Sequence, residues 1–259
     1  MDGVALCARF SLATNRLAYC GPADAEPALY EAIVTGHGSP RAREALSRFE
    51  ALMPYLEAIG AATGRDPFDR EVVEAYWLGN DLLEAVDRAR FLALLDALTR
   101  RGLPPSIARR LAEHLPREPV AHHAFHVSFV GVGAVTGHVP TTVPNIESCR
   151  PALAEVVAVA GDELEVAGPT VRAAGPRLEL AGRERRRVRY DARALVGVRV
   201  GSRVALHWSW PALLLDDRAA RDLERWTARS FEAANAALPA LGVDLEDPGR
   251  GPGGTTSRR

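Results

Sequence analysis

Apolar residues recur at three- and four-residue steps from about residue 25 to residue 115, which is the spacing of helices with one buried face. The clearest run extends from Ala45 to Ile59, and further apolar faces follow at residues 72–83 and 91–98. Gly64 and Gly102 stand where two of these helices would end. The pattern predicts a helical domain of about four to six helices.

The first residues of the chain fit two structures. Val4, Leu6 and Phe10 alternate with other residues, as they would in a strand, but the stretch is equally compatible with a short helix. The pair Gly21-Pro22 then marks a turn. The sequence leaves the conformation of this segment open.

After Pro119 the period becomes that of extended chain. Aromatic and β-branched residues dominate residues 125–135. From about residue 155, short runs rich in Val and Leu alternate with glycine-containing turns, a spacing typical of a small barrel. Asp216 precedes a last helical pattern and is a suitable N-cap.

We therefore predict an α+β protein in which an N-terminal helical domain is followed by a small OB-like β-barrel with a C-terminal helix. The mostly helical domain is expected to span residues 1–148 and to end in a His-rich extended segment. The barrel and its helix would occupy residues 149–238. Residues 239–259 are rich in Gly, Pro and Arg, and they are expected to form a disordered tail.

Composition narrows the class of protein. The chain has 259 residues and a formal net charge of -1, so it has no basic field to attract nucleic acid. The arginine-rich run at residues 183–187 lacks aromatic residues and favours a solvated hairpin. Three scattered cysteines do not make a disulfide framework, and neither a signal peptide nor a membrane-spanning run is present. We expect a cytoplasmic protein with no nucleic-acid or membrane partner.

The histidines are the strongest chemical signal. Four of the seven lie in one short stretch, as His122, His123, His126 and His138, and Cys149 follows. Imidazole and thiolate are standard ligands of transition metals, and imidazole titrates near neutral pH. The grouping predicts a metal, redox or acid–base site. Iron, zinc and nickel are the candidate metals, and no organic cofactor is expected.

Two conformations are open for the histidines. On a helix, His122 and His126 have the spacing of zinc proteases, but His123 replaces the glutamate that such a protease needs as its base. On a strand, His122 and His126 would share one face and His123 the other. The aromatic and β-branched residues that follow favour the strand. Hydrogen-bonded structural imidazoles at a domain junction are the alternative to a metal site.

The last third of the chain has a recognisable arrangement. Cys149 precedes an apolar strand, a later strand ends in His207, and an apolar turn leads to a helix that begins near Asp216. Over residues 149–227 this arrangement resembles the small HypC/HupF chaperones that mature nickel–iron hydrogenases. In that family the cysteine follows the initiator methionine, and a Pro-Gly pair comes a few residues later. Here Cys149 is internal, and Pro151 has no glycine beside it.

The resemblance implies that Cys149 and His207 help to hold an iron with cyanide and carbonyl ligands, and that both approach each other at the barrel mouth. The apolar turn, with Trp208, Trp210 and Leu213, would dock a hydrogenase large-subunit precursor or another maturation protein. We therefore expect an accessory factor for hydrogenase maturation that binds or hands over an iron fragment.

Two other functions stay open. A metal-dependent enzyme would use His122, His126 and His138 as ligands and keep one position for water. A plain interaction protein would use the barrel only to dock a partner. The amino-terminal part, through residues 76–80 and the histidine cluster, resembles an uncharacterised prokaryotic family to which no activity is attached.

Overall fold

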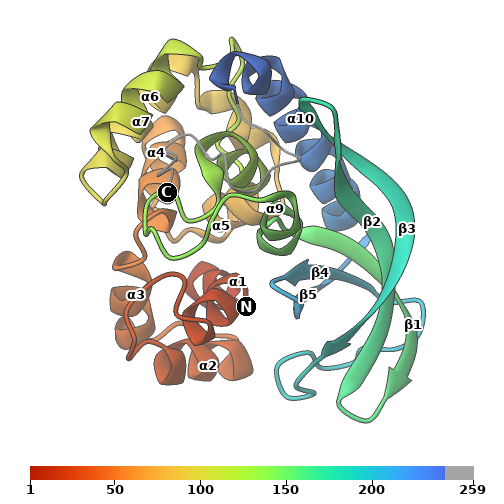
Figure 1. Ribbon diagram of the computed structural model, residues 1–259. Coiled ribbons are helices and arrows are strands. Elements are labelled where there is room, and N and C mark those ends of the chain that lie inside the picture. Colours follow the sequence, from red (N-terminus) through yellow and green to blue (C-terminus); the bar gives the residue numbers. More distant parts are fainter. Residues whose placement is uncertain (243–259) are drawn as a thin grey trace, which may run out of the picture.

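A computed structural model describes residues 1–242 and shows helices packed beside a five-stranded sheet (Figure 1). The predicted α+β class is confirmed. Of the tail predicted at residues 239–259, residues 239–241 belong to the last helix, and residues 243–259 lie outside the described residues. In the described part, no helix has both the length and the apolar character needed to cross a membrane.

All the regular elements among the first 149 residues are helices. In chain order they are α1 (Gly3–Arg16), α2 (Glu26–Thr35), α3 (Pro40–Ser47), α4 (Leu52–Thr63), α5 (Arg70–Trp77), η1 (Asp81–Ala85), α6 (Arg88–Thr99), α7 (Pro105–Glu113), α8 (His123–Phe125), η2 (His126–Gly131) and α9 (Val143–Cys149). The ambiguous first segment is helix α1, whose N-cap Asp2 accepts a hydrogen bond from the Ala5 N–H. Nearly all of α1 is buried, so it lacks the polar face that would reveal a helical period.

The sheet is antiparallel and open. Its strands are β1 (Ala152–Ala160), β2 (Glu163–Ala174), β3 (Arg177–Arg189), β4 (Arg203–His207) and β5 (Trp210–Leu215), and their order is β3-β2-β1-β4-β5. Because β3 and β5 have one hydrogen-bonded neighbour each, the closed OB-like barrel is not confirmed. The arginine-rich run lies on β3, where Arg183 and Arg185 pair with Glu155 and Glu165.

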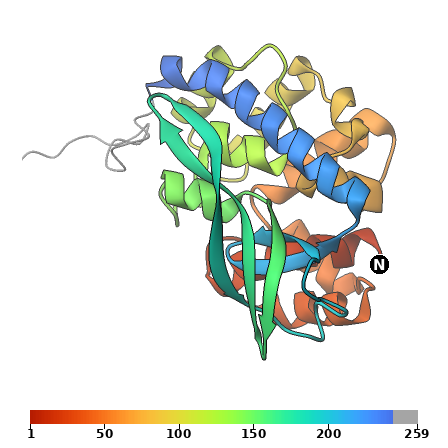
Figure 2. The same ribbon diagram turned by 90° about the vertical axis from the view of Figure 1, so that its right-hand side faces the viewer.

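The last helix, α10 (Asp217–Leu241), joins the sheet to the helices. Asp216 caps it by accepting from the Ala219 N–H, as the sequence predicts. Figure 2 shows β2 and β3 running beside α10, and the Asn235 amide bonds the backbone of Leu178 there at 2.8 and 2.9 Å. The largest apolar core includes Leu215 and Trp226 together with side chains of α1 to α7. The division of the chain at residue 149 stays a prediction.

The His-rich segment is helical, so the prediction of extended chain there is wrong. His123 opens the short helix α8, and residues 126–131 form the π-helix η2. Every residue of η2 is buried. Complete burial removes the alternation of polar and apolar faces on which a distinction between helix and strand depends, and a π-helix does not keep the usual helical period.

Candidate metal centre

His123, Cys149 and His207 meet between the helices and the sheet. The Cys149 Sγ lies 3.6 Å from His123 Nε2 and 3.8 Å from His207 Nε2, and all three side chains are buried. One ligand atom from each residue lies within 4.8 Å of the other two. A tetrahedral ion bonded at about 2.3 Å to sulfur and about 2.0 Å to nitrogen would separate those two atoms by about 3.5 Å. The spacing of this His-Cys-His cluster therefore fits one metal ion.

His123 is held by a capping interaction and by a tyrosine. His122 Nδ1 accepts a hydrogen bond from the Ala124 N–H at 3.2 Å and so caps helix α8. The next residue, His123, has its Nδ1 2.7 Å from the Tyr76 hydroxyl of α5 and its Nε2 toward Cys149. When the Tyr76 hydroxyl accepts a hydrogen bond from Nδ1–H, the proton of the neutral ring is on Nδ1 and the Nε2 lone pair is available for a metal.

Cys149 ends α9 beside a buried ion pair. The Arg150 guanidinium, which is 2% exposed, lies 2.8 Å from the Glu147 carboxylate and donates to the Pro169 carbonyl at 2.7 Å. Glu147 also accepts from the Val171 N–H at 2.9 Å. Since Pro169 and Val171 belong to β2, these bonds fix the end of α9 against the sheet and set the position of Cys149.

His207, the last residue of β4, has a defined tautomer. Its Nδ1 lies 2.6 Å from the Phe10 carbonyl oxygen of α1. A carbonyl can only accept, so Nδ1 carries the proton and Nε2 presents its lone pair to Cys149. An imidazole whose second nitrogen donates to a backbone carbonyl is the usual arrangement of a metal-ligating histidine.

Burial sets the protonation states of the cluster. It lowers the pKa of His207 to about 4, against the smaller opposing effects of contacts with Phe10 and Cys149. Burial, helped by the neighbouring histidines, also holds the pKa of His123 well below its usual value. Both imidazoles are therefore neutral at pH 7, which is their ligating form. Burial raises the pKa of the Cys149 thiol, and the Trp208 indole acts in the opposite direction. A metal would have to displace the thiol proton.

A small cavity of about 50 Å³ adjoins the cluster. Its volume is enough for a few atoms or small molecules beside a bound ion, since one water needs roughly 10–15 Å³ measured in this way. Most of its walls are apolar. It is lined by Thr14, Tyr19, Cys20, Ala51, His123, His126, Val132, Gly133, Val135, Thr136, Val139, Cys149 and Trp208.

The other predicted histidine ligands do not join the cluster, although the His126 ring stacks on His123 with centroids 5.8 Å apart. His126 lines the cavity, but its Nδ1 lies 3.1 Å from the Tyr55 hydroxyl. His122 uses its Nδ1 as the cap of α8, and burial lowers its pKa to about 3. His138 is exposed in the loop that precedes α9. The only metal-ligand group found among residues 1–242 is the His-Cys-His cluster, so His122, His126 and His138 do not converge as an enzyme centre would require.

The predicted docking residues are only partly exposed. Trp208 packs on Tyr19, with ring centroids 4.8 Å apart, and lines the cavity. The Arg16 guanidinium lies 5.6 Å from the centre of the Trp210 ring. Leu213 packs against the largest core. A docking role for Trp208, Trp210 and Leu213 stays a prediction.

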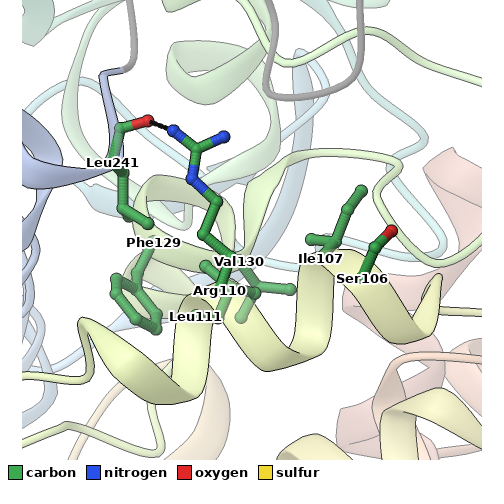
Figure 3. A pocket seen from close by; sticks show the side chains of 7 residues that line it. All are labelled: Ser106, Ile107, Arg110, Leu111, Phe129, Val130 and Leu241. Carbon is green, nitrogen blue, oxygen red and sulfur yellow. Dashed lines mark hydrogen bonds between the residues drawn. The ribbon is translucent and has the colours of Figure 1, made fainter.

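A second hollow lies between α7, η2 and the end of α10 (Figure 3). It encloses about 210 Å³, and the Arg110 guanidinium within it donates to the Leu241 carbonyl. This contact neutralises the carboxyl end of α10. No imidazole, thiol or carboxylate lines this hollow, and its described lining is Ser106, Ile107, Arg110, Leu111, Phe129, Val130 and Leu241.

Sequence reasoning missed the groups that orient the cluster. Tyr76 lies in the conspicuous run at residues 76–80, yet nothing in that run indicates that its hydroxyl meets His123. The Phe10 carbonyl is a backbone group, and no sequence signal could identify it. Arg150 carried a signal, because an arginine directly after a candidate ligand needs a buried acid if it points inward.

Comparisons with known proteins identify a family but not an activity. The DUF6390 family, described as a family of unknown function, matches residues 1–240, so the chain belongs to it. The match agrees with the expectation of an uncharacterised family and extends over the helices and the sheet alike. Searches of the curated proteins and of the solved structures gave no match.

Proposed function

We propose that this member of the DUF6390 family binds a transition metal at the His-Cys-His cluster and serves as an accessory factor in the maturation of nickel–iron hydrogenase. One observation carries the proposal. Cys149 and His207, which the resemblance to HypC/HupF chaperones pairs as iron ligands, are 58 residues apart in the sequence. Their Sγ and Nε2 atoms nevertheless lie 3.8 Å apart.

The charge of the cavity favours an iron that brings its own anions. The cluster offers one thiolate and two neutral imidazoles, and none of the described residues that line the cavity is Asp or Glu. A bare divalent ion would leave a net positive charge in apolar surroundings, which is costly. Iron that carries cyanide ligands would not leave a net positive charge there, because the cyanide anions offset the charge of the iron. Thiolate and imidazole are also suitable donors for such iron.

His123 would supply a third ligand, beyond the two that the resemblance implies. Its Nε2 faces the same sulfur atom as His207 Nε2. Three donors held by α8, α9 and β4 would bind the fragment firmly. Transfer to a hydrogenase large-subunit precursor would then require these elements to separate, because all three ligands are buried.

The proposal is tested by co-expressing the chain with the hydrogenase maturation proteins and purifying it without oxygen or chelator. Near-stoichiometric iron and infrared bands of cyanide and carbonyl are expected. Cys149→Ser and His207→Ala should lose both signals, whereas His138→Ala, which removes an exposed imidazole, should keep them. Deletion of the gene should lower hydrogenase activity.

The outcomes separate two parts of the proposal. Metal that stays at full occupancy in both Cys149→Ser and His207→Ala would exclude the cluster as the site. The maturation role would be refuted if the purified protein contained zinc and showed no cyanide or carbonyl bands, and if the deletion strain kept its hydrogenase activity.

A further inference from the structure

The link between β4 and β5 is an unusual tight turn. His207 pairs with Trp210, so Trp208 and Ser209 alone make the connection, and both have left-handed backbone conformations, with φ of 51° and 59°. Such turns favour Asn-Gly, because glycine has no β-carbon and asparagine tolerates this conformation, whereas most other residues lose about 1–2 kcal/mol in it. A tryptophan at this position therefore needs a compensating contact.

The turn is tied to the residue before Cys149. The Trp208 backbone N–H donates to the Ser148 carbonyl at 2.6 Å. The Trp208 side chain packs in the same apolar cluster as Cys149 and, with Tyr19, forms part of the cavity wall. The strained turn thus places an indole ring over the space beside the sulfur atom.

The indole N–H of Trp208 is buried and has no hydrogen-bond partner among the described residues. A buried donor without an acceptor costs about 1–3 kcal/mol. The indole N–H groups of Trp77 and Trp226 are also unpaired. Trp77 packs against the rings of His123 and His207, but neither tryptophan lines the cavity beside Cys149. The nearby neutral Cys149 thiol is a weak acceptor, whereas a thiolate is a strong one.

We propose that Trp208 is a positioning residue of the metal centre, whose indole N–H donates to the Cys149 sulfur once that sulfur is a metal-bound thiolate. Its ring closes the cavity over the ion. The inference rests on the proposed metal function and adds a specific donor to it. Hydrogen bonds to a ligating sulfur stabilise its charge, and loss of such an outer contact costs 10- to 100-fold in metal affinity.

Co²⁺ is the probe, because its absorption reports thiolate ligation directly. The full-length wild-type chain, Trp208→Phe and Trp210→Phe are titrated with Co²⁺, and folding is checked by circular dichroism. Trp208→Phe keeps a ring over the cavity but lacks the N–H. We expect it to bind Co²⁺ at least tenfold more weakly and to shift the sulfur-to-cobalt charge-transfer band to lower energy. Trp210→Phe, whose ring packs near Arg16 instead, should match the wild type.

A second measurement does not depend on the variant being folded. In wild-type protein labelled at its four tryptophans, Zn²⁺ should move the indole proton resonance of Trp208, identified through its contact with Tyr19, downfield. An unchanged charge-transfer band and an unchanged Co²⁺ affinity in folded Trp208→Phe would overturn the inference. An unmoved Trp208 indole resonance in zinc-loaded wild type would overturn it as well. If the wild type binds neither Co²⁺ nor Zn²⁺, the metal function itself fails, and the role of Trp208 fails with it.

Discussion

Tyr76→Phe is the sharpest test of how the metal ligands are held. The substitution removes only the hydroxyl that lies 2.7 Å from His123 Nδ1. Tyr76 is 1% exposed and its ring is retained, so no cavity larger than one oxygen atom forms. The loss leaves a buried imidazole nitrogen without its partner, which should lower the free energy of unfolding by about 1–3 kcal/mol.

The matched control is Tyr55→Phe. Tyr55 is equally buried, and its hydroxyl lies 3.1 Å from Nδ1 of His126, which is outside the His-Cys-His cluster. This substitution should cost a similar amount of stability. It should leave metal affinity unchanged, whereas Tyr76→Phe should reduce it about 10- to 100-fold, as expected for the partner of a ligating histidine.

Urea unfolding with and without excess Zn²⁺ separates the two effects. A ligand that binds only the folded state stabilises it in proportion to the logarithm of its affinity, so each tenfold loss removes about 1.4 kcal/mol. Tyr76→Phe should therefore lose about 1.4–2.8 kcal/mol more in the presence of zinc than in its absence. Equal losses in both conditions would show that Tyr76 supports the fold but not the metal site.

Three further predictions concern stability and organisation. Burial lowers the pKa of His126 from 6.5 to about 4, so its contribution to the stability of the metal-free protein is complete above pH 6.5 and is lost as the pH falls toward 4. The loss should reach about 3 kcal/mol, and it would be contradicted if the stability from urea unfolding fell equally with pH in wild type and His126→Asn. Arg150→Met removes one of the two guanidinium partners of Glu147, which keeps Arg186 at 2.9 Å, and leaves the Pro169 carbonyl without its donor. It should cost about 1–3 kcal/mol by thermal unfolding, and an unchanged melting temperature would contradict this role of the pair. Limited proteolysis should divide the chain near residue 150, and resistance of residues 140–160 to cleavage would favour one folding unit.

Much of the fold follows from local patterns. The helices between residues 25 and 115, the strands after residue 152 and the cap at Asp216 are visible because each element buries one face and exposes another, or begins at a residue suited to it. The fold class, α+β, could therefore be predicted correctly from the sequence. Closure of the sheet could not, because it depends on whether the two edge strands meet, and no local pattern records that.

The candidate site also has a part that the sequence predicts and a part that only the tertiary structure decides. The sequence by itself determined which residues could be ligands, namely a group of histidines followed by one cysteine. The resemblance to HypC/HupF chaperones then paired Cys149 with His207. Only the tertiary structure selected His123 from its neighbours and set His138 apart. The selection of His123 depends on its contacts with Tyr76 and Cys149, which lie far away in the sequence. It depends as well on a fully buried helical segment, whose sequence has no polar face to show which side chains point inward.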